Sequence, residues 1–235
     1  MQVLVIPDIH LKPWMFKRAA ELMRQGTADQ AVCLMDMPDD WNQEFNIGLY
    51  EETYDAAIQF AKDFPDTLWC YGNHDMSYLW YQLESGYSVY AQDTVQKKFR
   101  EFKKTIRADR SAFIHRIDNV LFMHGGLSDA FVKRYVPARY YNDIDKVVET
   151  INGFDAAKMW QNSSPLWFRP QDAEERMYKP KKMLQIVGHT PVSSFIKCGN
   201  VISCDVFSTY RNGRPIGIQE FLVVDTATWD FYGVK

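Results

Sequence analysis

The chain has 235 residues, of which 46% are hydrophobic and 24% are charged, and its formal net charge at pH 7 is −3. This length and hydrophobic content are sufficient for one domain with a substantial core. The small negative charge excludes a general electrostatic attraction to nucleic acid or to an anionic membrane, so an anionic substrate would have to be held locally, by metal ions or a few arginines.

The N-terminal sequence predicts neither a signal peptide nor a membrane anchor. Residues 3–6 are apolar and no basic region precedes them, and no apolar run approaches the ~18 residues of a membrane span. The cysteines lack a CxxC spacing and are expected to be reduced core thiols: Cys33, Cys70, Cys198 and Cys204. We therefore expect a cytoplasmic protein with no obligate partner.

The first third of the chain predicts alternating strands and helices. Apolar strands are expected at residues 2–6, 31–35 and 67–71, and amphipathic helices at 14–25 and 50–64. Each strand runs into a polar segment that contains an aspartate or an asparagine. Strands joined by helical crossovers are typical of a parallel α/β arrangement.

Residues 76–110 carry aromatic side chains first and basic ones later, which predicts a mostly helical, lid-like insertion, with packed surface helices as the alternative. A hairpin turning at Asp118-Asn119 and a broken helical stretch over 131–160 are expected next. Short strands dominate from residue 183: 184–187, 193–197, 201–204, 216–224 and 228–232. The whole predicts one α/β domain, residues 1–235, with two sheets packed face to face and flanked by helices.

The segment from Thr67 to Asp75 is the centre of the predicted site. Gly72 is expected to let the backbone turn, so that the next three residues are presented together at the end of a strand. The amide of Asn73 can bind a hard cation, the imidazole of His74 can transfer a proton, and the carboxylate of Asp75 can orient that imidazole.

Histidines follow apolar strands at four separate places in the sequence. Aspartates and one asparagine also directly follow apolar strands, so all of these side chains are expected to meet at one sheet edge. Oxygen and imidazole ligands without cysteine suit manganese, zinc or iron. The residues concerned are Asp8, His10, Asp36, Asn73, His74, His124 and His189. The fifth histidine, His115, lies in the predicted hairpin and is expected to be structural.

Five motifs follow one another between residues 8 and 190: Asp8-x-His10, Asp36-x-x-Asp39, Gly72-Asn73-His74-Asp75, His124-Gly125-Gly126-Leu127 and Gly188-His189-Thr190. This ordered set resembles the calcineurin-like metallophosphoesterases, and within them the branch of serine/threonine phosphoprotein phosphatases, their phage and bacterial relatives, and symmetric diadenosine tetraphosphatases. The segments 166–170 and 205–218 are similar to later parts of the bacterial and phage members.

The resemblance implies a four-layer αββα fold and two divalent transition-metal ions, with manganese preferred and zinc, iron or nickel as alternatives. One ion would be held by Asp8, His10 and Asp36, and the other by Asp36, Asn73, His124 and His189. A hydroxide bridging the two ions would attack phosphorus in line.

The resemblance also implies roles beside the metals. His74 would act as general acid, oriented by Asp39, and Arg169 would bind phosphoryl oxygens.

Three positions depart from the family pattern. Met35 stands where a glycine is usual before the bridging aspartate, which is tolerated if the backbone keeps an ordinary φ angle. Asp40 replaces a phosphate-binding arginine and so argues against ordinary phosphoprotein phosphatase activity. Candidates to replace that arginine are Arg139, Arg211 and Arg214. Pro191 stands in place of a second histidine, which argues against a nuclease-like member.

The leading hypothesis is a phosphatase acting on phosphomonoesters, phosphoproteins included. The alternative is a hydrolase of diadenosine tetraphosphate or another nucleotide anhydride, in which aromatic residues between 78 and 90 stack on bases. A third hypothesis, a protein-binding scaffold without activity, is disfavoured because the predicted site is complete.

Overall fold

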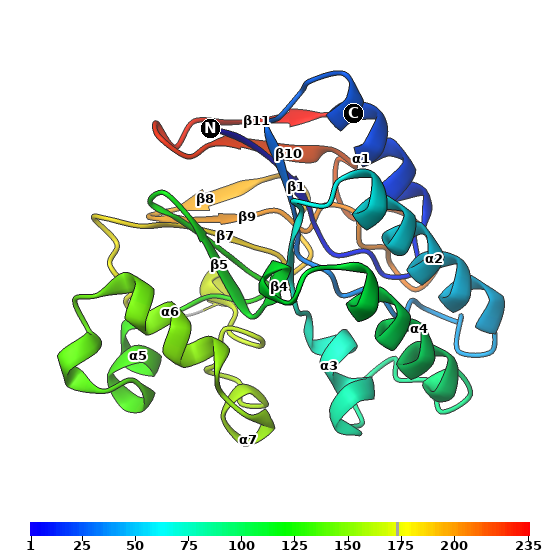
Figure 1. The fold of residues 1–235 in the computed structure, drawn as a ribbon, viewed down its shortest axis with the longest axis horizontal. Coiled ribbons are helices and arrows are strands. Elements are labelled where there is room, and N and C mark those ends of the chain that lie inside the picture. The colour runs from blue at the N-terminus through cyan, green and yellow to red at the C-terminus, as the bar shows by residue number, and fades with distance from the viewer. Residues whose placement is uncertain (173) are drawn as a thin grey trace.

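The computed structural model describes residues 1–172 and 174–235 and has four layers, with helices on both outer sides of two facing sheets (Figure 1). The first sheet has six strands in the order β11-β10-β1-β2-β3-β4. Its strands β1 to β4 are parallel to one another, whereas β10 and β11 are antiparallel additions. The strands are β1 (Gln2–Ile6), β2 (Gln30–Cys33), β3 (Leu68–Cys70), β4 (Ser111–Ala112), β10 (Phe221–Asp225) and β11 (Phe231–Val234).

The second sheet has five strands in the order β5-β6-β7-β9-β8. Its central strands β6, β7 and β9 are parallel, and β5 and β8 form antiparallel edges. The predicted hairpin at Asp118-Asn119 is confirmed, since Ile117 pairs with Val120. The strands are β5 (Ile114–Ile117), β6 (Val120–Met123), β7 (Leu184–Val187), β8 (Ile196–Cys198) and β9 (Val201–Ser203).

The helices divide between the two outer faces. Buried side chains of α1, α2 and α4 pack against the first sheet, and those of α5, α6 and α7 pack against the second (Figure 1). The helix α3 begins directly after β3. The helices are α1 (Trp14–Arg24), α2 (Ile47–Asp63), α3 (Asn73–Trp80), α4 (Gln92–Thr105), α5 (Asp129–Tyr135), α6 (Ile144–Asn152) and α7 (Ala156–Met159), with 3-10 turns at Ala108–Arg110, Ala138–Tyr140 and Pro170–Asp172.

The strand β1 shows why its sequence is continuously apolar. Val3 and Val5 point into the core between the sheets, while Leu4 and Ile6 point toward the helices α1 and α2. Both faces of this strand are therefore buried, as in other parallel sheets with helical crossovers. The second sheet contributes Phe122, Ile186 and Ile202 to the same inter-sheet core.

The strands after residue 183 divide between the two sheets. The strands β7, β8 and β9 belong to the second sheet, but β10 returns to the first sheet and pairs with β1. The strand expected over 216–224 is shorter, because β10 begins only at Phe221. This return encloses β1 between two neighbours and makes one continuous core from the two ends of the chain.

Three of the four cysteines are buried free thiols, as predicted, but Cys198 is exposed on the edge strand β8. Contrary to the expectation, Cys198 is not a core residue, because the short edge strand β8 leaves all three of its residues exposed to solvent. Among the described residues, no helix combines the length and apolarity needed to cross a bilayer.

His115 supplies a test of stability against pH. Its side chain is buried between the sheets, and its Nε2 lies 3.2 Å from the carbonyl oxygen of Trp69. Burial lowers the pKa of His115 to about 4. As the pH is lowered from ~6.5 to 4, the unfolded chain therefore binds a proton at this histidine that the folded chain does not bind. The free energy of unfolding consequently decreases by up to about 1.4 kcal/mol for each pH unit of acidification.

The variant His115→Gln keeps a donor for Trp69 but cannot titrate. Urea unfolding of the metal-free protein at several pH values should show a smaller loss of stability between pH ~6.5 and 4 for the variant than for the wild type. Parallel losses in the two proteins would contradict this assignment.

Candidate active site

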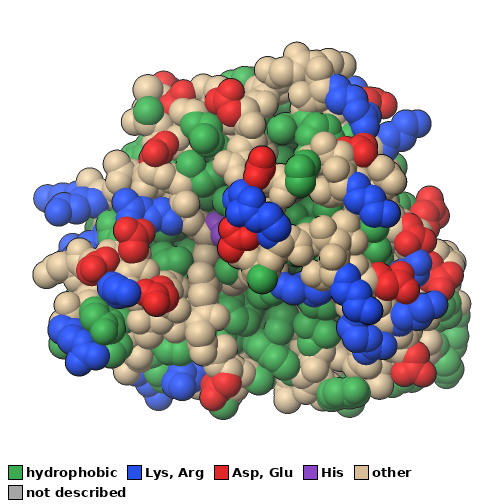
Figure 2. All heavy atoms as spheres, in the orientation of Figure 1, with side chains coloured by type: hydrophobic (Ala, Val, Ile, Leu, Met, Phe, Trp, Pro, Cys, Tyr) green, Lys and Arg blue, Asp and Glu red, His purple; other side chains and the backbone are tan. Residues whose placement is uncertain are grey.

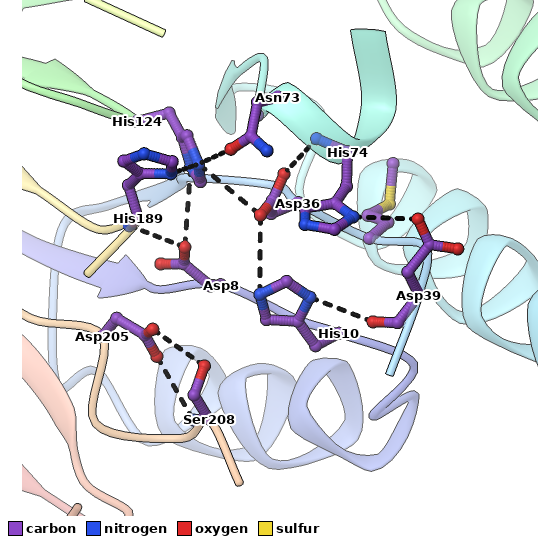
Figure 3. A network of polar contacts seen from close by, with 12 residues as sticks. Asp8, His10, Asp36, Asp39, Asn73, His74, His124, His189, Asp205 and Ser208 are labelled. Carbon is purple, nitrogen blue, oxygen red and sulfur yellow. Dashed lines mark hydrogen bonds and ion pairs between the residues drawn. The ribbon is translucent and has the colours of Figure 1, made fainter. Parts of the chain in front are cut away.

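The candidate ligands converge where strands of both sheets end. Figure 3 shows their side chains pointing toward one shared space, although they come from loops far apart in the sequence. The first sheet supplies residues that follow β1, β2 and β3, and the second supplies residues that follow β6 and β7. The structure brings together all six candidate ligands: Asp8, His10, Asp36, Asn73, His124 and His189.

The imidazole of His124 is surrounded by other ligand atoms. Its Nε2 lies 2.9 Å from Oδ1 of Asn73, 3.1 Å from Nδ1 of His189 and 3.5 Å from Oδ2 of Asp36. Its other ring nitrogen lies 3.6 Å from Oδ1 of Asp8. Several lone pairs therefore face one small volume, which is the arrangement of a cation site.

Asp36 occupies the centre of the site. Its Oδ2 lies 3.5 Å from Nε2 of His10 and 3.5 Å from Nε2 of His124, so a single carboxylate oxygen lies close to both imidazoles. Two groups of side chains have potential ligand atoms within 4.8 Å of one another, and Asp36 belongs to both. The groups are His10, Asp36 and His74, and Asp8, Asp36 and His124. The first group includes His74, which the family resemblance leaves outside the metal ligands. The second group joins Asp8 to His124, whereas the resemblance assigns Asp8 and His124 to different ions.

The electrostatics of this centre favour positive charge. Burial and the neighbouring carboxylates of Asp205 and Asp36 raise the pKa of Asp8, and burial first, then Asp75, raises that of Asp36. Burial also lowers the pKa of His124, and burial together with Arg169 lowers the pKa of His189 to about 3. These imidazoles are therefore neutral and able to bind a metal.

Two buried atoms of the centre have no hydrogen-bond partner within the described part of the chain. They are Oδ2 of Asp8 and Nε2 of His189. An unpartnered buried polar atom costs free energy, and a bound cation would remove that cost. The donor set therefore fits divalent metal ions, and Asp36 belongs to both groups of candidate ligands.

His74 and Asp39 form a pair at the edge of the site. Nδ1 of His74 lies 2.8 Å from Oδ2 of Asp39, whose other oxygen accepts hydrogen bonds from the hydroxyls of Tyr50, at 3.0 Å, and Tyr78, at 2.5 Å. Burial lowers the pKa of His74, but the carboxylates of Asp36, Asp39 and Glu84 outweigh it and raise the pKa to about 10. The imidazole therefore carries a proton at neutral pH.

Asp75 has a different role from the one that the sequence suggested. Its carboxylate accepts hydrogen bonds from the backbone N–H groups of Asp36, at 2.8 Å, Met37, at 3.1 Å, and Gly72, at 3.0 Å. It therefore fixes the loop after β2, and Asp39 is the carboxylate that contacts the ring of His74.

The backbone at Met35 and Asp36 is strained, whereas the sequence analysis expected an ordinary φ angle at Met35. Met35 and Asp36 have φ angles of 52° and 51°, in the left-handed region. This turn lets the carbonyl groups of Met35 and Asp36 accept hydrogen bonds from Ile9 and His10, which joins the loops after β1 and β2. Such residues cost on the order of 1–3 kcal/mol each and persist mainly at functional sites.

Gly72 is required for a reason other than the expected turn. Its φ angle of −91° is available to any residue. A Cβ atom at this position, however, would lie only 2.2 Å from Oδ1 of Asp36. Gly72 therefore permits the close approach of β3 to the central carboxylate.

Asp40, where the family has an arginine, is already paired. Its Oδ2 accepts a hydrogen bond from Nζ of Lys12 at 3.0 Å, and Thr209 and the backbone of Trp41 donate to Oδ1. A free carboxylate here would repel an anionic substrate, but its charge is offset by Lys12, a buried lysine that the sequence reasoning missed. Asp40 also lines a hollow of about 380 Å³ together with Arg211, one of the three proposed replacement arginines.

Arg169 lies beside the candidate ligands. Its Nη1 donates hydrogen bonds to the carbonyl oxygen of His189, at 2.8 Å, and to Oγ1 of Thr190, at 2.9 Å. The preceding segment is fixed because Gly125 and Gly126 donate backbone hydrogen bonds to Pro165 and Phe168. A guanidinium has five N–H donors, so this anchoring leaves donors for a phosphoryl group.

The sequence reasoning also missed Tyr50, Tyr78 and Glu84. The tyrosines lie on helices α2 and α3, and Glu84 follows α3, so none of them belongs to a motif. The helical periodicity around the two tyrosines indicates only buried positions, and no sequence pattern marks Glu84, so the hydrogen bonds of these residues to Asp39 and Asn73 could not be predicted.

The face of the molecule drawn in Figure 2 carries no dominant charge. Figure 2 shows basic and acidic side chains intermingled over the visible face, and only a small area of histidine reaches it. This distribution agrees with the net charge of −3. Local groups, rather than the field of the whole molecule, must therefore recognise an anionic substrate.

Comparison with known structures supports the fold. A cold-active protein-tyrosine phosphatase from a psychrophilic Shewanella species matches with a TM-score of 0.61 and 17% identity, covering 100% of this chain and 80% of its own. A protein described as hypothetical from Pyrococcus horikoshii matches with a TM-score of 0.51 and 13% identity, covering 100% and 87%. Among curated proteins, none matches this chain.

The sequence profile of the calcineurin-like phosphoesterases matches residues 1–213. That range contains all the candidate ligands, the His74–Asp39 pair, the whole second sheet and four of the six strands of the first sheet. The family depends on a dinuclear metal centre, and the side chains that converge around Asp36 are the candidate ligands for it. The chain therefore belongs to the calcineurin-like phosphoesterase family and is a metal-dependent hydrolase of phosphoric ester bonds.

Proposed function

We propose that this protein is a phosphatase that hydrolyses phosphomonoesters at a dinuclear centre, with manganese as the preferred metal. The observation that carries the proposal is the position of Asp36, whose Oδ2 lies 3.5 Å from Nε2 of both His10 and His124, next to the protonated imidazole of His74. Asp8, His10 and Asp36 would hold one ion, and Asp36, Asn73, His124 and His189 the other. Bound divalent ions supply positive charge for the phosphoryl oxygens and lower the pKa of the attacking water.

The side chains around this centre would bind the substrate and move the proton. Arg169 would hold non-bridging phosphoryl oxygens through the guanidinium donors that it does not use on His189 and Thr190. His74 would give its proton to the leaving alkoxide from Nε2, because Nδ1 is directed at Asp39. Asp39 would stabilise the imidazolium and keep the ring in this orientation.

Nucleotide anhydrides are the less favoured substrates. The stacking hypothesis needs exposed aromatic faces between residues 78 and 90, but Tyr78 is fully buried and stacks on Tyr87 with ring centroids 4.3 Å apart. Trp80 packs on Phe113 and Trp160. These rings belong to the core, which leaves Tyr81 and Tyr90 as the exposed aromatics of the segment.

A substrate panel tests the proposal. Chelator-treated protein reloaded with Mn²⁺ should release phosphate from p-nitrophenyl phosphate and from phosphopeptides, and should do so more rapidly than it cleaves bis-p-nitrophenyl phosphate or diadenosine tetraphosphate. Faster turnover of the diester or of the nucleotide would reassign the substrate class. A loaded enzyme that hydrolyses none of the four would contradict the proposal.

A further inference from the structure

Glu84 is an acidic residue that no motif explains, and it reaches into the site from the segment between α3 and α4. Its side chain is only 8% exposed, whereas the neighbouring Leu83 is 76% exposed. This reverses the ordinary preference, since carboxylates are rarely buried and leucines usually are. A buried charge of this kind is costly unless it has a specific interaction.

The contacts of Glu84 are directed at two residues of the site. Its Oε2 accepts a hydrogen bond of 2.8 Å from Nδ2 of Asn73. Its Oε1 lies 3.7 Å from Nδ1 of His74 and has no hydrogen-bond partner among the described residues. Glu84 therefore lies behind the amide of Asn73, on the side away from His124.

This contact fixes which way the amide faces. With Nδ2 donating to Glu84, the oxygen Oδ1 points to Nε2 of His124 at 2.9 Å and faces the shared space (Figure 3). In the flipped orientation, the amide oxygen would meet the carboxylate of Glu84, and the NH₂ group would face the ligand atoms. An NH₂ group cannot bind a cation, so only the observed orientation is useful there.

The segment that carries Glu84 is held in place independently. Ser88 donates through its hydroxyl to the carbonyl of Glu44 at 2.5 Å and through its backbone N–H to the hydroxyl of Tyr78 at 2.8 Å. Gly86 lies next to the His74–Asp39 pair, since a Cβ atom there would be in van der Waals contact with both side chains, at 3.4 Å. The carboxylate is thus delivered by an anchored loop.

We propose that Glu84 is a positioning residue that orients the amide of Asn73 toward the metal ion held by Asp36, Asn73, His124 and His189. The assignment rests on the proposed metal centre and adds a hydrogen-bond partner behind one of its ligands. Such partners typically change metal affinity by ~10–100-fold when they are removed.

Calorimetric titration of chelator-treated protein with Mn²⁺ tests this assignment. Glu84→Ala should weaken Mn²⁺ binding by ~10–100-fold. Glu84→Gln should retain most of the affinity, because its amide oxygen can still accept from Asn73. Leu83→Ala, an exposed neighbour on the same loop, should bind as the wild type does, and circular dichroism should show that all variants are folded.

A double-mutant cycle separates an effect through Asn73 from a general effect of charge. In an Asn73→Ala background, Glu84→Ala should cause no further loss of Mn²⁺ affinity. Equal losses for the alanine and glutamine variants, or full additivity with Asn73→Ala, would overturn the orienting role. If the wild type and Glu84→Ala bind Mn²⁺ and turn over phosphomonoesters equally well, only this inference fails. A wild type that binds no Mn²⁺ would overturn the metal centre as well.

Discussion

Asp36→Asn should reduce phosphatase turnover at saturating substrate by roughly 10³-fold or more, because the carboxylate proposed to bind both cations is lost. Metal ions contribute several kcal/mol of transition-state stabilisation, and each ~1.4 kcal/mol corresponds to a factor of ten in rate. Asparagine keeps an oxygen that can accept the hydrogen bond of the His74 backbone N–H, 2.8 Å from Oδ1 in the native chain. The change therefore removes charge without removing that contact.

The measurement is phosphate release with Mn²⁺ titrated over a wide range, together with metal content by elemental analysis. Asp93→Asn, which neutralises an exposed carboxylate in the first turn of α4, should behave as the wild type. A variant at Asp36 that keeps two equivalents of metal and most of its activity would contradict the central place of this residue.

The same substitution should have the opposite effect on the metal-free protein. Burial first, and then the neighbouring carboxylates of Asp75 and Glu84, raise the pKa of Asp36, so its ionised form is disfavoured in the folded chain. Asparagine relieves that cost, and the melting temperature of the chelator-treated variant should not fall below that of the wild type. The centre is thus arranged for cation binding at the expense of the stability of the empty fold.

The elements that place the site were predictable because they rest on short local patterns. The apolar run of β1 with Asp8 behind it, and the hairpin before His124, each follow from residues within a few positions of one another. The convergence of these loops follows from one rule, that parallel strands bring their carboxyl ends to one edge. The return of β10 beside β1 depends instead on pairing between residues more than 200 positions apart, which periodicity does not encode.

Errors near the site have a common cause. Gly72, Met35 and Asp75 were each interpreted from their own local chemistry, whereas their actual roles depend on the close approach of β2 and β3. The same holds for Lys12, whose ammonium neutralises the carboxylate of Asp40 across a distance of 28 positions. Contacts of this kind are fixed by tertiary packing, so a sequence motif predicts candidate ligands but not the groups that hold them.

The strongest test of the proposed chemistry is His74→Asn, which should lower turnover of an alkyl phosphate such as β-glycerophosphate by ~10²–10⁴-fold. A general acid matters most when the leaving oxygen is a strong base. The loss should therefore be smaller with p-nitrophenyl phosphate, whose leaving group departs without much protonation. Asp39→Asn should reproduce this dependence on the leaving group more weakly, because the ring of His74 remains but loses the carboxylate 2.8 Å from Nδ1.

Metal content decides between the two roles open to His74, since its ligand atoms also lie close to those of His10 and Asp36. If His74 is the proton donor, His74→Asn should still bind two equivalents of Mn²⁺, and its activity should fall without a change in metal affinity. If the variant instead loses one equivalent, His74 is a ligand and another group must protonate the leaving oxygen. His115→Gln is the matched control, because that histidine contacts Trp69 outside the site and its replacement should alter neither turnover nor metal content.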